Sequence, residues 1–370
     1  MIEHRVAPSR EIQRHPAAYP RCQAAVTREC SIARILQAWH RWVRRAHSVI
    51  RIRVTRGEQE WSLDPRQFEG FAFEDGDKVS VLTPATAKPF PVVWGDTCVP
   101  VSPGVSVRVP AAYTFAEFKG FRIPSHLMAL TGAGADTLQS IGEDHIAKYR
   151  KHVGMSPDMT IVDLGCGIGR DAFELLDYLN GPGRYIGVDV TRDSIVWAQR
   201  AITPKYPRFT FHHLDAYSEL YNPFGAKATT ECRLPVEDAA ADRIVLASVF
   251  THLLEDEVRH YLREFRRVLK PNGMVYASFF LYTPEALKAA MLHGNTAWAA
   301  TFKHVLGDGV YGNDPTYPRG AVAYTDAAMQ RMLAASGMRL VRPYLKGWWS
   351  GLHGDQAEDG QDVAILMRES

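Results

Sequence analysis

The sequence predicts an α/β fold, a mostly parallel doubly wound sheet with helices on both faces, preceded by a small β-rich domain. Three observations lead to this prediction. From about residue 116 onward, short apolar segments alternate with segments of helical periodicity. Within that region one strand runs directly into a glycine-rich turn and a helix. Between about residues 49 and 110, apolar residues recur at every second position, and a chain of 370 residues is long enough for two domains.

Composition excludes several classes of protein. Hydrophobic residues make up 46% of the chain and charged residues 23%, which is typical of a globular protein with a large core. A net charge of +2 gives no general attraction to nucleic acid or anionic lipid. The five cysteines include no C-x-x-C pair, which predicts neither a disulfide framework nor a metal site. Without a signal peptide or an apolar run of about 18 residues, we expect a cytoplasmic protein with no transmembrane segment.

We expect residues 1–115 to form an N-terminal region with one basic helix and a small β-rich domain. The helix is indicated by apolar residues at helical spacing and by nearby arginines, namely Ile32, Ile35, Leu36, Trp39, Val43, Arg41, Arg44 and Arg45. Such a helix can lie on a membrane, but packing on its own domain is favoured because it carries few arginines. Apolar residues alternate with other residues around Val54, Val79 and Val107, and a turn is expected at residues 76–77. This pattern predicts a sandwich or barrel of short strands.

The most informative segment is the passage from a strand into a helix at residues 160–170. An apolar strand runs into Gly165, Gly167 and Gly169. Glycines here allow a tight turn and let a ligand approach the backbone closely. The helix that follows would direct free N–H groups at an anionic part of that ligand. Dinucleotide sites favour G-x-G-x-x-G, and Arg170 stands where their last glycine would lie, so a NAD-dependent dehydrogenase is disfavoured.

Two acids follow the next two strands. The strand over residues 184–189 ends in Asp189, twenty residues beyond Gly169, where an acid can accept hydrogen bonds from both hydroxyls of a ribose. A third strand over residues 209–214 is followed by Asp215. An acid in a solvated loop is the alternative interpretation at both positions.

The remaining segments continue the alternation of strands and helices. They are a strand over residues 242–247, a helix that begins near Glu255 and stops at Pro271-Asn272-Gly273, a strand over 274–281, a helix over 325–335, and strands over 339–343 and 362–367. Acids at the start of the first helix and basic residues at its end match the helix dipole. Residues 282–323 stand outside this pattern as an insertion.

The order D-x-G-x-G-x-G at residues 163–169, together with Asp189 and this order of segments, resembles the class I (Rossmann-like) S-adenosylmethionine-dependent methyltransferase family. The resemblance covers about residues 141–281. Within it, Tyr221-Asn222-Pro223 and Ser248-Val249-Phe250-Thr251-His252 are similar to bacterial small-molecule methyltransferases that often accompany glycosyltransferases of surface polysaccharide assembly. The family implies a seven-stranded sheet with an antiparallel last strand, in a methyltransferase domain over residues 116–370, with S-adenosylmethionine as cofactor.

The resemblance also implies which residues hold the cofactor. Asp215 would hold the adenine amino group, and Tyr149 would reach the carboxylate end from the preceding helix, although a helix-packing role for Tyr149 is an equal alternative. The implied set is Tyr149, Asp163, Gly165, Cys166, Gly167, Gly169, Asp189, Val190, Asp215, Ala216 and Ser248.

His252 is the candidate general base. An alcohol loses its proton as it is methylated, and a positioned base contributes about 10²–10⁴-fold to such a step. His252 follows the fourth strand, where open parallel sheets place their ligand crevice, and an ordinary pKa of about 6.5 suits the task. A histidine that bonds the loop backbone and shapes the site is the alternative.

The insertion at residues 282–323 is the candidate lid and acceptor pocket. Loops longer than about 12–15 residues are uncommon unless they are functional. Its aromatic residues, Trp298, Phe302, Tyr311 and Tyr317, suit the apolar faces of sugars or other ring compounds. A small helical subdomain with ordinary core aromatics is the alternative.

The predicted function is methyl transfer from S-adenosylmethionine to a small-molecule acceptor, with a sugar hydroxyl as the first candidate. A protein or nucleic-acid methyltransferase is less favoured, because Ser248-Val249-Phe250 stands where amino-methylating enzymes carry Asn/Asp-Pro-Pro-Tyr. A basic stripe interleaved with aromatics is also missing from the catalytic part of the sequence, so no nucleic-acid partner is expected. A non-catalytic scaffold that kept cofactor binding is a further alternative. The sequence leaves the acceptor and the oligomeric state open.

Overall fold

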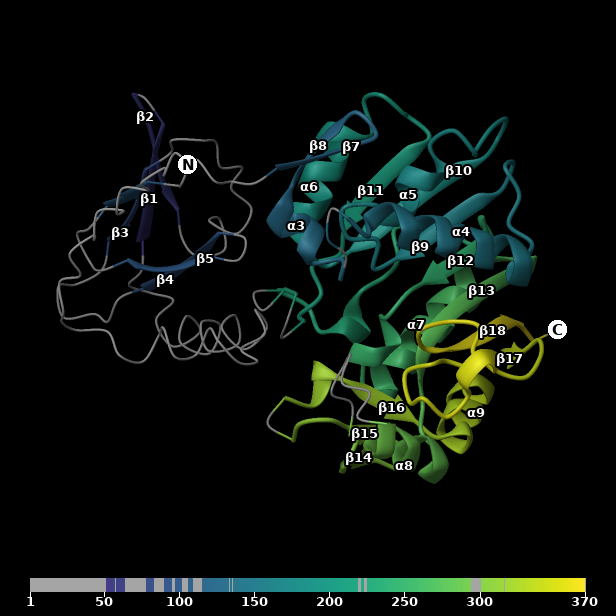
Figure 1. Ribbon diagram of the computed structural model, residues 1–370. Coiled ribbons are helices and arrows are strands. Elements are labelled where there is room, and N and C mark those ends of the chain that lie inside the picture. Colours follow the sequence, from purple (N-terminus) through teal and green to yellow (C-terminus); the bar gives the residue numbers. More distant parts are fainter. Residues whose placement is uncertain are drawn as a thin grey trace, which may run out of the picture.

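The structure is a computed structural model (Figure 1). It describes residues 115–369 apart from 133, 135, 219–220, 223–224, 294–300 and 316, and, nearer the N-terminus, residues 51–56, 58–63, 78–82, 90–94, 97–101 and 106–108. The basic helix expected within residues 32–45 lies outside the described residues, as does the predicted turn at residues 76–77.

The N-terminal strands are short and antiparallel. They are β1 (Arg51–Arg56), β2 (Gln59–Leu63), β3 (Lys78–Leu82), β4 (Phe90–Trp94), β5 (Thr97–Val101) and β6 (Ser106–Arg108). Four of them form a sheet in the order β2-β1-β3-β6, and β4 pairs with β5. Val54 is opposite Val79, which in turn is opposite Val107, so the alternating residues of the sequence do lie on paired strands.

From residue 115 to 246 the chain builds the first half of the main sheet. Its elements are β7 (Phe115–Phe118), β8 (Phe121–Pro124), α3 (Ser125–Ala129), α4 (Leu138–Val153), β9 (Thr160–Leu164), α5 (Arg170–Leu175), β10 (Arg184–Asp189), α6 (Arg192–Ala201), β11 (Phe209–His213), η1 (Thr229–Glu231) and β12 (Ala241–Leu246). The β7–β8 hairpin packs on this half through Phe121, whose ring contacts those of Phe173 and Trp197.

The second half carries the insertion and the final strands. Its elements are η2 (Phe250–His252), α7 (Glu255–Val268), β13 (Leu269–Leu281), α8 (Pro284–His293), β14 (His304–Gly307), β15 (Val310–Gly312), η3 (Pro318–Gly320), β16 (Val322–Tyr324), α9 (Asp326–Ala334), β17 (Met338–Leu340), η4 (Gly354–Gln356) and β18 (Asp362–Arg368).

The main sheet has ten strands, so the predicted number of seven is wrong. Seven of the ten are the predicted strands: β9 to β13 run parallel to one another, and β18 pairs antiparallel with both β13 and β17. The other three, β14, β15 and β16, come from the insertion and are joined to the sheet where β16 pairs with the last two residues of β13. Each of the three strands has only three or four residues, which is too short for a clear period in the sequence.

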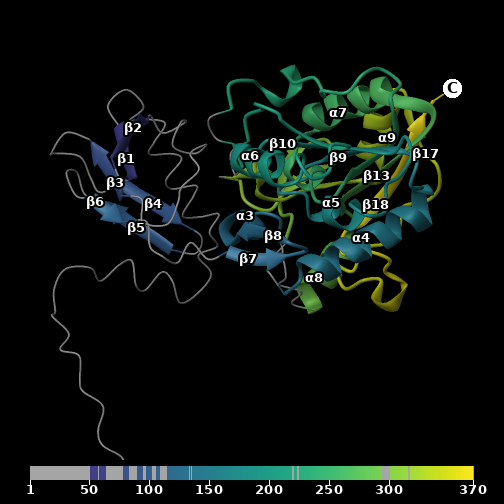
Figure 2. The same ribbon diagram turned by 90° about the horizontal axis from the view of Figure 1, so that it is seen from above.

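Helices cover both faces of the sheet, as predicted. Alternate residues of each strand face opposite sides. Val162, Ile244 and Val275 belong to a core shared with α7 and α9, whereas their neighbours Ile161 and Val245 belong to a core shared with α4, α5 and α6. Figure 2 shows α7 and α9 on one side of the sheet and α4 and α5 on the other. Within the described part of the chain, no helix is long and apolar enough to cross a membrane.

Candidate functional site

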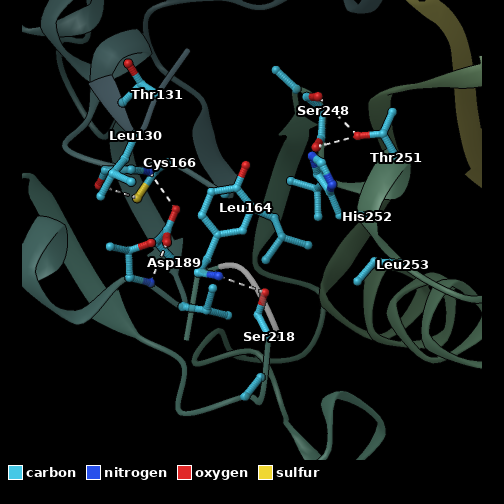
Figure 3. Close-up of a pocket in the computed structure, with 18 of the residues that line it drawn as sticks. Leu130, Thr131, Leu164, Cys166, Asp189, Ser218, Ser248, Thr251, His252 and Leu253 are labelled. Atoms are coloured by element: carbon cyan, nitrogen blue, oxygen red, sulfur yellow. Dashed lines mark hydrogen bonds between the residues drawn. The ribbon is translucent and has the colours of Figure 1, made fainter. Parts of the chain in front are cut away.

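A cavity of about 420 Å³ lies at the carboxyl ends of β9, β10, β12 and β13. The chain reverses its strand order beside β9, which pairs with β10 on one side and β12 on the other, and open α/β sheets place ligands at such a point. Figure 3 shows Leu130, Thr131, Cys166 and Asp189 on one side of the cavity, and Ser248, Thr251, His252 and Leu253 on the other.

Nine of the predicted site residues line this cavity. They are Asp163, Gly165, Cys166, Gly167, Asp189, Val190, Ala216, Ser248 and His252. The other three, Tyr149, Gly169 and Asp215, do not. Gly169 is the residue before α5 and has a left-handed φ of 87°, so its place is in the turn rather than in the cavity wall. The Asp215 side chain is exposed and accepts a hydrogen bond from the Ala226 backbone N–H at 3.2 Å.

The glycine turn brings backbone to the cavity surface. Gly165 has a φ of 83° and Gly167 a φ of 55°, and residues with a side chain rarely adopt such positive values. A Cβ on Gly165 would lie 2.4 Å from the Val249 Cγ2 atom, and one on Gly167 would lie 2.9 Å from the Thr131 Cγ2 atom. The turn therefore requires glycine both for its backbone conformation and for the close packing around it.

Asp189 is buried at the end of β10, where its carboxylate is fixed by the backbone. Its Oδ2 atom accepts from the Gly167 N–H at 2.7 Å, and its Oδ1 atom accepts from the Thr191 N–H at 2.6 Å. Burial raises the pKa of Asp189, and these two hydrogen bonds oppose that effect. Because a carboxylate oxygen accepts more than one hydrogen bond, both oxygens keep capacity for ligand hydroxyls.

Two further carboxyls, those of Asp163 and Asp171, line the cavity and are held in opposite states. Asp163 accepts from the Tyr185 hydroxyl at 2.5 Å, and its pKa is raised by burial and by the negative charge of Asp171. Burial would also raise the pKa of Asp171, but His145 and Arg170 together hold it well below its usual range. The pair therefore carries its negative charge on Asp171.

Asp171, Arg170 and His145 were not predicted from the sequence as site residues. The Asp171 carboxylate is 3.0 Å from His145 Nδ1 and 3.1 Å from Arg170 Nε, and it accepts from the Tyr149 hydroxyl at 2.8 Å. Tyr149 thus lies behind Asp171 and reaches the cavity only through it. One available signal was the i,i+4 spacing of His145 and Tyr149, which puts both side chains on one face of α4.

Ser248 occupies a strained turn directly after β12. It has a φ of 62°, which costs on the order of 1–3 kcal/mol in a residue other than glycine. A ring of hydrogen bonds holds it: the Ser248 N–H donates to Ser278 Oγ at 2.7 Å, Ser278 Oγ donates to Gln361 Oε1 at 2.7 Å, and Gln361 Nε2 donates back to Ser248 Oγ at 2.9 Å. This ring fixes the start of the loop that carries His252.

The His252 ring is oriented by a backbone carbonyl of the insertion. Its Nδ1 atom is 3.0 Å from the Arg319 carbonyl oxygen. Because a carbonyl oxygen can only accept, Nδ1 carries the proton, and in the neutral ring Nε2 is left with a free lone pair. Burial lowers the pKa of His252, while the Arg319 and Gly320 carbonyls act in the opposite direction. Neutral imidazole is thus favoured at pH 7, in a form that accepts a proton at Nε2.

The insertion contributes Arg319, Gly320 and Ala321 to the cavity wall. Three of its aromatic residues, Phe302, Tyr311 and Tyr317, do not line the cavity. Phe302 is fully buried against Phe280 and Trp349, and Tyr311 stacks on Tyr282 with ring centroids 3.8 Å apart. These rings hold the insertion on the sheet, as ordinary core aromatics do. Trp298 lies outside the described residues.

The end of the cavity near His252 is polar but carries little net charge. Tyr217, Ser218, Tyr221, Thr251, Tyr261 and Gln361 line the cavity with Phe280 and Leu253. The Arg319 guanidinium is paired with Glu257, with Nε–Oε2 and Nη2–Oε1 distances of 3.2 Å each. Among the described residues, no group of three or more His, Cys, Asp or Glu side chains is arranged to hold a metal ion.

Residues 161–273 match the family model of a methyltransferase domain. A tRNA N(3)-cytidine methyltransferase from Gallus gallus is 26% identical over 34% of this chain and 32% of its own length. An arsenite methyltransferase from Aquipseudomonas alcaligenes is 26% identical over 45% of this chain and 44% of its own length. This chain therefore spans less than half the length of the curated relatives it matches.

Among solved structures, the 1,6-didemethyltoxoflavin-N1-methyltransferase of Burkholderia thailandensis, with bound S-adenosylhomocysteine, matches at 17% identity and a TM-score of 0.40 over 65% of this chain and 83% of that chain. The family match and the curated relatives support a methyltransferase that uses S-adenosylmethionine as its cofactor.

Proposed function

We propose that this chain transfers a methyl group from S-adenosylmethionine to the hydroxyl group of a small molecule, with His252 as the general base. The observation that carries the proposal is the contact of His252 Nδ1 with the Arg319 carbonyl oxygen, because a proton on Nδ1 leaves Nε2 able to accept a proton beside a glycine-lined cavity. A sugar hydroxyl of a glycan precursor is the first candidate acceptor. It rests on the similarity of Ser248-Val249-Phe250-Thr251-His252 to glycan-associated methyltransferases.

The cavity fits the cofactor on the observations made above. The positive-φ glycine turn, which a Cβ would obstruct, leaves room for close approach. The Asp189 carboxylate keeps acceptor capacity for the two ribose hydroxyls. Arg170 lines the same cavity and would attract the carboxylate of the methionine part, whereas the negative charge of Asp171 would attract its ammonium group. When bound, S-adenosylmethionine supplies an activated methyl group on a sulfonium.

The chain's own contribution to the reaction is position and proton transfer. His252 Nε2 takes the hydroxyl proton of the acceptor as the oxygen becomes bonded to the methyl group. Nδ1–H stays hydrogen-bonded to the Arg319 carbonyl, which stabilises the imidazolium that forms. Holding the acceptor oxygen in line with the methyl group is worth on the order of 7–11 kcal/mol at best. The apolar side chains of Leu253 and Phe280 exclude water from the reacting end.

A nucleic-acid methyltransferase is the second candidate, because two of the relatives act on tRNA cytidine according to their names. Two features favour the small molecule. The loop after β12 reads Ser248-Val249-Phe250 in place of the Asn/Asp-Pro-Pro-Tyr of amino-methylating enzymes. The only cation that lines the acceptor end among the described residues, Arg319, is already paired with Glu257.

Calorimetric titration of the full chain with S-adenosylmethionine, and separately with NAD, tests the cofactor. We expect micromolar affinity for S-adenosylmethionine, none for NAD, and loss of affinity in Asp189→Ala. Asp238→Ala, which changes an exposed acid remote from the cavity, is the control and should bind as the wild type does. An unchanged affinity in Asp189→Ala, or tight binding of NAD, would contradict the proposal. The same titration of Asp215→Ala shows whether this exposed acid contributes to binding of S-adenosylmethionine.

A further inference from the structure

We propose that the end of the insertion, with Tyr324 directly after it, is a positioning device for the base: Arg319 and Tyr324 fix the ring and the turn of His252 so that Nε2 faces the acceptor. This inference rests on the proposed function of His252. It gives residues 318–324 a role that differs from a lid, because they act on the orientation of one side chain. Two independent sets of contacts lead to it.

The first set fixes the turn. His252 ends η2, a single 3₁₀ turn with few backbone hydrogen bonds of its own. The Tyr324 hydroxyl donates to the Phe250 carbonyl at 2.9 Å and is 2.5 Å from the Leu253 carbonyl, so it spans both ends of that turn. Tyr324 is fully buried. The turn therefore depends on a side chain more than seventy residues further along the chain.

The second set fixes the ring. The carbonyl that accepts from His252 Nδ1 belongs to Arg319, the middle residue of η3. The Arg319 side chain makes a two-pronged ion pair with Glu257, whose side chain is 7% exposed and whose carboxylate also accepts from the Leu254 N–H at 2.8 Å. Bidentate pairing of this kind sets direction as well as distance. The Arg319 carbonyl is thus anchored to α7 through its own side chain.

A rigid connection to the sheet makes the device possible. β16 pairs with β13 at Phe280–Ala323 and Leu281–Tyr324, so the insertion is held by the same strand that ends at the cavity. The charges near His252, on Arg319 and Glu257, neutralise each other, and the Tyr221 ring packs edge-on to the imidazole at 5.7 Å. Without the Arg319 carbonyl, the proton would be free to move to Nε2, and the ring would then present a donor to the acceptor hydroxyl.

The tautomer can be measured directly by long-range proton–nitrogen correlation NMR of the full chain with ¹⁵N-labelled histidine, at a pH where the ring is neutral. His252→Gln identifies the His252 signals by their absence. We expect the Nδ1–H tautomer in the wild type. In Glu257→Gln, which removes the charge that anchors Arg319, we expect a mixture of tautomers. The matched control is Glu255→Gln, the same change two residues away on α7, where the partner is Arg331.

Turnover supplies the second measurement. Glu257→Gln should lower kcat by up to about 10²-fold, the scale of a loss of alignment, with an unchanged Kd for S-adenosylmethionine. Tyr324→Phe should also lower kcat. This second variant tests the proposal if Glu257→Gln folds poorly. An Nε2–H tautomer in the wild type would overturn the inference, as would a Glu257→Gln chain that keeps the wild-type tautomer. Because the NMR readout needs no acceptor, a wild type with the Nδ1–H tautomer and no methylation would instead refute the proposed function.

Discussion

At the scale of residues, the cavity concentrates buried titratable groups whose pKa values are moved apart. Asp163 and Asp171 are both buried, yet one is held protonated and the other charged, because only Asp171 has His145 and Arg170 against it. Perturbed groups of this kind cluster at functional sites more often than elsewhere. Such groups also make the free energy of unfolding depend on pH.

Asp163→Asn should remove a loss of stability that occurs as the pH rises from about 4 to about 8. Burial raises the pKa of Asp163 to about 8, above the value of 3.8 expected in the unfolded chain. Between these values the folded state binds more protons, so its contribution to stability falls as pH rises through that window, by at most about 1.4 kcal/mol per pH unit. Urea unfolding at pH 5 and pH 8 should show this fall in the wild type and a weaker one in Asp163→Asn. Glu117→Gln, an exposed control, should behave as the wild type.

His252→Ala should lower kcat by about 10²–10⁴-fold and leave the Kd of S-adenosylmethionine nearly unchanged. In the wild type, burial lowers the pKa of His252 below 6.5, so kcat/KM should fall only on the acid side of that value. Steady-state kinetics across pH 5 to 8 would measure both effects. A variant that lost cofactor affinity while keeping its turnover would assign His252 to the shape of the site.

At the scale of elements, the glycine turn and the strands around it could be predicted, because each strand has a recognisable apolar pattern and the glycines mark where the strand ends. The β9–α5 passage and the acid at the end of β10 were read from Gly165, Gly167, Gly169 and Asp189 alone. The insertion could not be read in this way. Its strands are too short to show a period. They pair with one another, and β16 alone joins them to the main sheet through β13, which is a non-local contact.

The sequence also could not predict whether the side chains of Tyr149 and Asp215 reach the cavity. Each stands at the expected distance along the chain from the glycine turn. Whether a side chain reaches the cavity depends instead on its local partner, which is Asp171 for Tyr149 and the Ala226 N–H for Asp215. Spacing therefore located the elements of the site well, and individual side chains less well.

Gly165→Ala should abolish cofactor binding. The substitution places a Cβ 2.4 Å from Val249 Cγ2 and adds the strain of a φ of 83°, which alone costs about 1–2 kcal/mol. Gly181→Ala is the matched control, since its φ is 50° and nothing lies within 4 Å of the added atom. We expect it to lose only the strain energy in urea unfolding and to keep its Kd in calorimetry. Equal behaviour of the two variants would show that the turn tolerates a side chain.

At the scale of the whole molecule, the described residues that line the cavity all lie between Leu130 and Gln361. The β7–β8 hairpin belongs with them structurally, because Phe118 and Phe121 both pack on the ring of Phe173. The boundary proposed near residue 115 therefore keeps the β7–β8 hairpin together with this core.

A chain that begins at residue 112 should therefore fold and bind S-adenosylmethionine with the Kd of the full chain. A chain that begins at residue 125 lacks both phenylalanines, and deletion of one buried phenylalanine side chain costs about 3–5 kcal/mol. Thermal unfolding should show a clearly lower Tm for the shorter of the two. Loss of cofactor affinity in the chain from residue 112 would place part of the site in the N-terminal region.

The strand β13 pairs with two different strands, one after the other along its length. It pairs with β18 over Val275–Phe279 and with β16 only at Phe280 and Leu281. The insertion is thus joined at the very tip of a strand whose other pairings never involve it. We therefore expect that residues 282–323 could be exchanged as a unit without disturbing the register of the sheet, for a segment that keeps the Arg319–Glu257 pair and the Arg319 carbonyl on which His252 depends. Under the proposed function, such an exchange would redirect the choice of acceptor while the nucleotide half of the site is inherited intact.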